Sequence, residues 1–161
     1  MSTVRRKPHR LPAHYYIGQK AIAYTVCLAD RRPQLNSEQI VMPLLEILED
    51  KMAVTDCQVG IYCFMPDHLH IIACGQTDNA NSKRAMDAFK QESGRFLKDR
   101  FPQVVWQGDY YDHIIRRSHD WRRQVAYVFR NPVRARLVEN GFDYPYTGSI
   151  GYDLQDLVAG Y

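Results

Sequence analysis

The chain has 161 residues, of which 45% are hydrophobic and 12% aromatic. A chain of this length can bury a core of its own, and this composition excludes an intrinsically disordered protein. The formal net charge is only +3, but the cations cluster near the N-terminus and between residues 116 and 136. Such clusters favour a polyanionic partner, although a solvated basic helix would show the same pattern.

Apolar runs and cysteines indicate the compartment. No apolar run reaches the roughly 20 residues that a membrane span needs, and the basic N-terminus lacks the apolar stretch of a signal peptide. The four cysteines form no C-x-x-C pair, and Cys27, Cys63 and Cys74 lie in apolar runs. We interpret them as reduced core residues. We therefore expect a cytoplasmic protein with no membrane partner.

The first half of the chain predicts a strand, a helix and a hairpin. Residues 1–12 form a polar, basic arm that we expect to be poorly ordered when free. The patterns of β-branched, aromatic and periodic apolar residues then predict a strand over 21–28, a helix from a cap at Asn36 or Ser37 to about residue 52, and hairpin strands over 55–64 and 68–74.

The second half predicts two helices, a strand and a tail. Ser82 can cap a helix over 82–98, and an aromatic strand follows over 110–116. The last helix begins near Ser118 or Asp120, and Pro132 is expected to stop or kink it, because the residue before proline is pushed out of the helical region. A further helical turn is expected over 133–138. Residues 143–161 are expected to form a wrapping tail.

The element order predicts the fold. Strand, helix, two strands, helix and strand are the split βαβ, or ferredoxin-like, arrangement, which is an α+β antiparallel sheet with helices on one face. A last C-terminal helix remains to cross the open face or edge of that sheet. We expect one domain over residues 1–161, with no internal repeat.

The hairpin contains a candidate metal-binding pair. His68 and His70 are placed at the start of its second strand, so both face one way while Leu69 faces the core. Two imidazoles on a rigid strand make half of a metal site. Taken alone, the pair could equally be two ordinary surface or core histidines. Asp67 is interpreted as a turn residue.

The last helix contains the second candidate constellation. Tyr127 and Asn131 are four residues apart and share a face, on which Gln124 also lies. Two histidines and an amide oxygen would give a divalent ion three ligands and leave positions for substrate oxygens. A tyrosine beside such an ion is a plausible nucleophile, although its free pKa of about 10 requires activation. The alternatives are a solvent-facing tyrosine and an asparagine that caps the helix before proline.

Three segments of the chain resemble one known family. Met65-Pro-Asp-His-Leu-His70 resembles the His-hydrophobic-His motif of the single-tyrosine HUH transposases. Trp106-Gln-Gly-Asp-Tyr-Tyr-Asp-His-Ile-Ile-Arg116 is similar to the segment before the last helix of those proteins. Tyr127-Val-Phe-Arg-Asn-Pro-Val-Arg134 resembles the Tyr-x-x-x-Asn-Pro-Val pattern of the REP-associated tyrosine transposases. The resemblance covers roughly residues 14–142.

The resemblance implies a metal-dependent DNA strand transferase on a ferredoxin-like fold. By that likeness, His68 and His70 bind Mg²⁺ or Mn²⁺, and Asn131 takes the third-ligand position, where related insertion-sequence enzymes have glutamine. Tyr127 attacks a phosphate in single-stranded DNA beside a hairpin. The attack leaves a 5′-phosphotyrosine and a free 3′-hydroxyl, and a 3′-hydroxyl of another strand reverses the reaction. The protein would act as a monomer or a homodimer.

Basic residues supply the candidate DNA contacts. Lys90 lies on a basic helix face, and Arg116, Arg117 and Arg123 are similar cases, each with a solvated side chain as the alternative. A second hypothesis is a non-catalytic module that binds single-stranded nucleic acid by aromatic stacking on a ferredoxin-like sheet. That module would use Tyr24, Tyr62, Phe64, Tyr110 and Tyr111. A relaxase or replication initiator is a third reading, disfavoured by the short chain.

Overall fold

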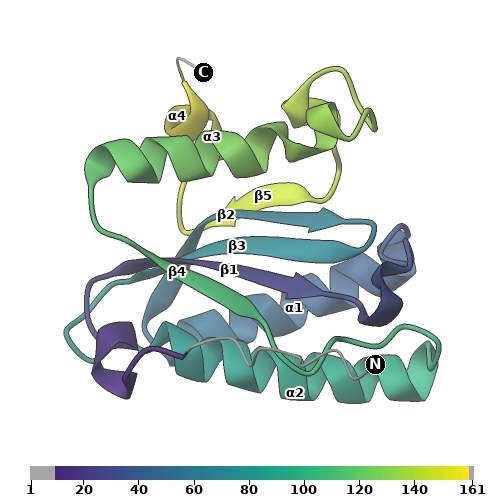
Figure 1. The fold of residues 1–161 in the computed structure, drawn as a ribbon, viewed down its shortest axis with the longest axis horizontal. Helices are drawn as coiled ribbons and strands as arrows, with labels where there is room; N and C mark the ends of the chain where they lie inside the picture. The colour runs from purple at the N-terminus through teal and green to yellow at the C-terminus, as the bar shows by residue number, and fades with distance from the viewer. Residues whose placement is uncertain (1–9, 160–161) are drawn as a thin grey trace, which may run out of the picture.

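A computed structural model of the protein describes residues 10–159, and its centre is a five-stranded antiparallel sheet (Figure 1). The strands are β1 (Ala21–Cys27), β2 (Cys57–Met65), β3 (His68–Gly75), β4 (Tyr111–Ile115) and β5 (Thr147–Ile150). Their order across the sheet is β4-β1-β3-β2-β5. The hairpin strand that carries the two histidines is therefore the central one, and β4 is an edge strand.

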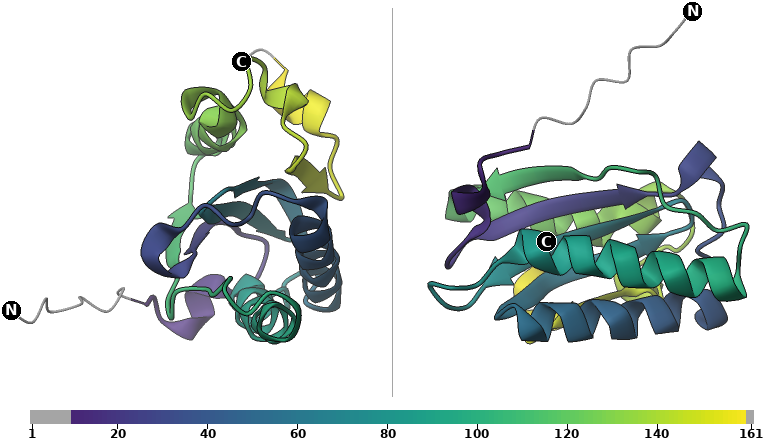
Figure 2. Two further views of the ribbon diagram at one scale, coloured as in Figure 1. Left: turned by 90° about the vertical axis from the view of Figure 1, so that its right-hand side faces the viewer. Right: turned by 90° about the horizontal axis from the view of Figure 1, so that it is seen from below.

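Helices cover both faces of this sheet (Figures 1 and 2). The α-helices are α1 (Glu38–Val54), α2 (Ser82–Arg100), α3 (Ser118–Arg134) and α4 (Leu154–Val158). Short 3₁₀ helices span Ala13–Tyr16, Ala29–Arg31 and Gly141–Asp143. The first two α-helices pack on one face, and α3 crosses the opposite face. The predicted ferredoxin-like class is confirmed, and most element ends lie within two residues of the sequence-based ranges.

Alternation along β1 shows how the sequence builds two different faces. Ile22, Tyr24 and Val26 belong to the core beneath α1 and α2, whereas Ala21 and Ala23 face α3. Successive strand residues point to opposite faces, so the large side chains fill one side and the small ones leave room on the other. This difference positions the site described below.

The cap of α2 differs from the prediction. Asn81, not Ser82, is the N-cap residue, and its side-chain oxygen accepts a hydrogen bond from the backbone N–H of Arg84 at 3.0 Å. Ser82 is buried in the first turn, where its hydroxyl lies 2.7 Å from that of Tyr24. Both residue types suit a cap, and the buried tyrosine hydroxyl selects the serine as its own partner.

The end of α3 is a second correction. The helix does not stop at Asn131 but continues through Pro132 to Arg134, and no separate helical turn follows over 133–138. Pro132 is buried, and the N–H of Ala135 still donates to the carbonyl of Asn131 at 3.0 Å. Packing therefore outweighs the local cost of proline. As a result, Asn131 lies inside a regular helix, on the same face as Tyr127.

The C-terminal tail is more regular than the sequence predicts. Residues of the tail form β5, which pairs with β2, and then α4. The hydroxyl of Tyr144 donates to the carbonyl of Phe64, and Val158 packs into the core under α3. The tail thus extends the sheet at the edge opposite β4.

Three further expectations can be checked within residues 10–159. The four cysteines are buried free thiols, as predicted. None of the helices in this range combines the length and apolar character needed to cross a membrane. Most of the predicted basic arm lies outside the described residues. Its last cation, Arg10, donates to Asp112 of β4 at 2.8 Å.

Candidate active site

The two histidines converge on the face of β3 that looks toward α3. Their Nε2 atoms lie 3.1 Å apart, and Leu69 between them is buried on the opposite face, as the alternation predicts. Two nitrogens held at about 2.1 Å from one ion and at a right angle would be about 3 Å apart. The spacing therefore fits two ligands of a single metal ion.

The outer nitrogens of both rings have oxygen partners. His68 Nδ1 lies 2.6 Å from Asp67 Oδ1, and His70 Nδ1 lies 3.1 Å from Thr25 Oγ1. When Nδ1–H donates to these oxygens, the lone pair of each ring is on Nε2, where the two rings meet. The turn residue Asp67 and the strand residue Thr25 thus orient the pair in the way that outer-shell groups orient metal-ligating histidines.

Charge and burial keep these groups in the protonation states that metal binding needs. Burial is the main cause that lowers the pKa of His70 to about 4, and the nearby cations Arg134 and Arg31 act in the same direction. Its ring is therefore neutral at physiological pH. Partial burial acts to raise the pKa of Asp67, but hydrogen bonds from His68 and Arg31 hold it below its usual value. The carboxylate is thus ionised and accepts both bonds.

Asn131 of α3 adds an amide to the two imidazoles. Its Nδ2 lies 3.4 Å from His68 Nε2. The oxygen and nitrogen of a carboxamide exchange places by a half-turn, so the same position can present an oxygen ligand. Nowhere within residues 10–159 do three His, Cys, Asp or Glu side chains gather in a metal-binding cluster. The two histidines and one amide that the sequence predicts as ligands do meet at this point.

Tyr127 completes the predicted constellation. Its ring centroid lies 5.9 Å from that of His70, and 52% of the residue is exposed. The guanidinium carbon of Arg134 lies 4.0 Å from the centroid of the tyrosine ring, and its Nη2 donates to the Tyr127 carbonyl at 2.8 Å. The structure therefore brings together all four residues that the sequence singles out, and it places a cation against the tyrosine.

Arg123 lies in a basic groove next to this tyrosine. We use that name for a hollow of about 540 Å³ along α3, which is lined by His119, Arg122, Arg123, Ala126, Tyr127, Arg130 and Arg134. Four of these side chains are arginines that project from one helix face. A groove of this charge beside a candidate nucleophile suits a phosphate backbone.

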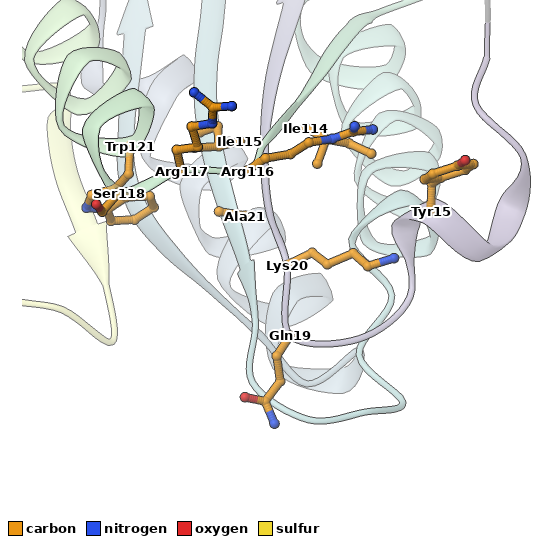
Figure 3. A pocket seen from close by; sticks show the side chains of 10 residues that line it. All are labelled: Tyr15, Gln19, Lys20, Ala21, Ile114, Ile115, Arg116, Arg117, Ser118 and Trp121. Atoms are coloured by element: carbon orange, nitrogen blue, oxygen red, sulfur yellow. The ribbon is translucent and has the colours of Figure 1, made fainter.

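Arg116 and Arg117 lie elsewhere, where β4 leads into α3 (Figure 3). They line a hollow of about 590 Å³ whose other lining includes Tyr15, Lys20 and Trp121. This hollow is also basic and aromatic, but it does not include the histidines or Tyr127.

Lys90 is on α2, across the sheet from α3. Its ammonium donates to the carbonyls of Gln107 and Gly108 at 2.7 and 3.0 Å, and burial lowers its pKa. The structure does not bring Lys90 together with the histidine pair, and its contact with DNA stays a prediction.

Four residues of the site were not singled out from the sequence as part of it. Asp67 adjoins the His-x-His motif and Arg134 closes the Tyr-x-x-x-Asn-Pro-Val segment, so their positions were visible, but their contacts were not. No sequence motif pointed to Thr25 or Arg31 as residues of the site. Thr25 meets His70 only because β1 and β3 pair in a particular register.

Comparison with known proteins identifies the family of this chain. Residues 19–129 match the model of a family described as "Transposase IS200 like". A REP-associated tyrosine transposase of Escherichia coli (strain K12) is 28% identical over 137 residues, which are 83% of this chain and 78% of the relative. In fold, the chain is similar to a solved REP-associated tyrosine transposase bound to a REP hairpin, with a TM-score of 0.73 and 24% identity over 88% of this chain and 81% of the other. The family resemblance predicted from the motifs is confirmed, and the chain belongs to the IS200-like transposase family.

Proposed function

We propose that this transposase cuts and rejoins single-stranded DNA beside a hairpin, using a divalent metal ion and a covalent tyrosine intermediate. One observation carries the proposal: His68 and His70 on β3 converge with Asn131 and Tyr127 on α3. Membership of a transposase family already implies DNA cleavage and rejoining. The placement of these four residues supports the more specific mechanism.

In this proposal His68, His70 and Asn131 hold Mg²⁺ or Mn²⁺. When bound, the ion neutralises charge on a phosphate and polarises the phosphorus for attack. Asp67 and Thr25 keep both Nε2 lone pairs directed at the same point. Nitrogen ligands favour softer ions and oxygen ligands favour Mg²⁺, so a mixed set is compatible with either metal.

Tyr127 is the proposed nucleophile. Its phenolic oxygen forms a bond to phosphorus while the bond from phosphorus to the 3′-oxygen breaks. The phenolic proton leaves to solvent, and the departing 3′-oxygen takes up a proton. The product is a 5′-phosphotyrosine and a free 3′-hydroxyl. Arg134, held against the tyrosine ring, can neutralise negative charge that develops on the phosphate.

Rejoining is the reverse step. A 3′-hydroxyl attacks the phosphotyrosine, and Tyr127 leaves with restoration of its phenol. One phosphoester bond replaces another in each direction, so no ATP is required. In this proposal the histidines, the asparagine and the tyrosine of one chain form the site, so the protein would act as a monomer or as a homodimer with two such sites.

The proposed substrate is a DNA hairpin with an adjoining single strand. The basic groove, with Arg123, and the hollow that contains Arg116 and Arg117 supply cations on the α3 side of the molecule. The E. coli relative is a REP-associated transposase, and the solved structure of similar fold holds a REP hairpin. These likenesses support a hairpin as the first substrate to try.

The alternative of a non-catalytic binding module is less well supported. Of the five aromatic residues that would form its stacking surface, Tyr24, Phe64 and Tyr110 are buried in the core. A buried ring has no free face for a base. The module also requires neither the convergent histidines nor the tyrosine beside them.

The decisive experiment is trapping of the covalent adduct. The protein is incubated with 5′- or 3′-labelled single-stranded hairpin DNA and Mg²⁺ or Mn²⁺, and the products are separated on a denaturing SDS gel. We expect label to migrate with the protein only when it is placed 3′ of the cut. Hairpin binding without any adduct under either metal would favour the binding-module alternative.

A further inference from the structure

A small hollow lies between α3 and the β4 edge, directly beside Tyr127. It measures about 260 Å³. Its floor is Ala23 and Thr25 of β1, and its sides are formed by Tyr111 and His113 of β4 and by Gln124 and Tyr127 of α3. His70 also lines it, so the hollow adjoins the proposed metal site. None of the steps proposed above uses this space.

Strand register explains why the hollow is there. Thr25 pairs with His70 of β3 on one side and with Tyr111 of β4 on the other, so the three side chains form one row across the sheet. Ala23 pairs with His113 in the next row on the same face. Small side chains on β1 lower the floor of the hollow, and α3 packs mainly over β2, away from β4.

The lining suits a planar, uncharged group better than a phosphate. Within residues 10–159 the hollow has no lysine or arginine in its lining, in contrast to the basic groove that also contains Tyr127. Asp112 contributes no free carboxylate, because its side chain is bound to Arg10 and to the hydroxyl of Tyr16. The basic groove is therefore the better place for DNA phosphates, and the hollow is better suited to an uncharged group.

Two side chains supply what a nucleobase requires. Tyr111 is 61% exposed, and exposed aromatic residues stack on bases. The carboxamide of Gln124 both donates and accepts hydrogen bonds, as the edges of bases do. The space amounts to roughly nine times the 30 Å³ that one water molecule occupies in the liquid, which is ample for one heterocycle.

We propose that this hollow binds one nucleobase of the single strand next to the scissile phosphate, and that it thereby sets the base preference of cleavage. Tyr111 stacks on the base, and Gln124 contacts its edge. The proposal rests on the proposed function, since it assumes that the strand passes Tyr127. It adds a specificity subsite that adjoins the proposed metal site at His70 and the basic groove at Tyr127.

The test compares base discrimination in the wild type and in variants of the hollow. Hairpin substrates carry each of the four bases, or an abasic residue, on either side of the cleaved bond. We expect the wild type to prefer one base over the abasic residue by about tenfold or more at one of these positions. Gln124→Ala should reduce the differences among the four bases. Tyr111→Ala should reduce the advantage of any base over the abasic residue, and Tyr111→Phe should restore it.

Gln155→Ala is the matched control, because Gln155 is exposed on α4. It should keep the wild-type preferences. If Gln124→Ala and Tyr111→Ala, shown by circular dichroism to be folded, both retain the wild-type ratios among bases and the abasic residue, the subsite assignment is wrong.

Failure of the proposed function gives a different result. In that case no substrate forms an adduct, whichever base it carries. The same oligonucleotides are then used for binding by fluorescence anisotropy. A base-dependent affinity that Gln124→Ala and Tyr111→Ala remove would support the subsite without the chemistry, whereas equal affinities for base and abasic strands would refute it.

Discussion

The two faces of the sheet are built for different purposes. The face beneath α1 and α2 is closed by large apolar side chains, among them Leu44, Leu48 and Phe89, which are fully buried. The face beneath α3 is apolar only in part, around Ile61, Ile72 and Val125. On its remaining part lie His68, His70 and Thr25, with Tyr127 above them.

The difference shows how one sheet can combine a rigid core with an open polar site. Central strands β1 and β3 are fixed from below by the apolar core, so the polar side chains on their upper side need little packing of their own. The start of α3 is held close to β2 because Gly60 has no side chain: a Cβ there would lie 2.5 Å from the Trp121 ring. Predictions that treat the two faces separately can test this division.

The largest expected effect is the loss of the adduct in Tyr127→Phe. The change removes the attacking oxygen and keeps the ring that packs beside Arg134 and His70. We expect no covalent protein–DNA product, with hairpin binding retained and the free energy of unfolding changed by no more than about 0.5 kcal/mol, as for most surface substitutions. Mass spectrometry of the wild-type adduct should find the nucleotide on the peptide that contains Tyr127. Tyr146→Phe is the control, and an adduct on Tyr144 or Tyr146 would refute the assignment.

Removal of a metal ligand should be nearly as severe. Outer partners of metal-binding histidines typically contribute 10- to 100-fold to affinity or activity, so loss of a ligand itself should cost more than about 100-fold. We expect His68→Ala and His70→Ala to lower cleavage by at least that factor while circular dichroism still shows a folded protein. Isothermal titration with Mn²⁺ should show the loss of binding directly. Full wild-type cleavage in excess EDTA would disprove a metal requirement.

On the other face, a truncation should weaken the fold and spare the chemistry. Leu44 is fully buried between α1 and the sheet, so Leu44→Ala should lower the free energy of unfolding by about 2–5 kcal/mol. Urea denaturation measures the loss, and adduct formation at a temperature where the variant is folded measures the chemistry. If cleavage falls in the folded variant as steeply as in His68→Ala, the two faces are not independent.

The half-buried His70 should make the metal-free protein sensitive to acid. The pKa of His70 is about 4 in the folded chain, below the value of about 6.5 expected after unfolding. As the pH falls from 6.5 to 4, the unfolded chain gains a proton that the folded chain does not, so stability decreases, by about 3 kcal/mol in all. Denaturation in EDTA across this range should show the decrease, and His70→Gln should remove it. If the free energy of unfolding falls equally with pH in the wild type and in His70→Gln, other groups cause the acid sensitivity.

The smallest effects are expected at the basic residues. Hairpin binding should weaken as salt rises, because bound phosphates release counterions. Arg123→Ala should weaken binding and reduce the salt slope by about one. Lys90→Ala should also weaken binding without changing metal affinity, and Lys83→Ala, on the same helix, is its control. If Arg123→Ala weakens hairpin binding and Lys90→Ala does not, the DNA contacts the α3 side of the sheet and not α2.

Much of the fold could be predicted from the sequence because the signals are local. Alternation on either side of His68 and His70 predicts a hairpin strand with both histidines on one face, and a spacing of four predicts that Tyr127 and Asn131 share a helix face. The order of elements then predicts a ferredoxin-like sheet. The family motifs lie in these same segments.

Local signals failed where a tertiary contact competed with them. Asn81 and Ser82 are both good caps, and the buried hydroxyl of Tyr24 decides between them. Pro132 predicts a break, but burial of its ring and the carbonyl bond of Asn131 carry the helix onward. The tail gave no clear periodicity, and it becomes a strand because β2 offers an unpaired edge.

The sequence by itself determined which residues the proposed chemistry uses: two histidines, an asparagine and a tyrosine, each on a predictable face of its own element. Only the tertiary structure decided that α3 crosses the sheet so that these faces meet, and that Thr25, Asp67 and Arg134 surround them. The physical reason is that a face is fixed by the period of a single strand or helix, whereas contacts between elements depend on strand register and on how helices pack, which no short stretch of sequence encodes.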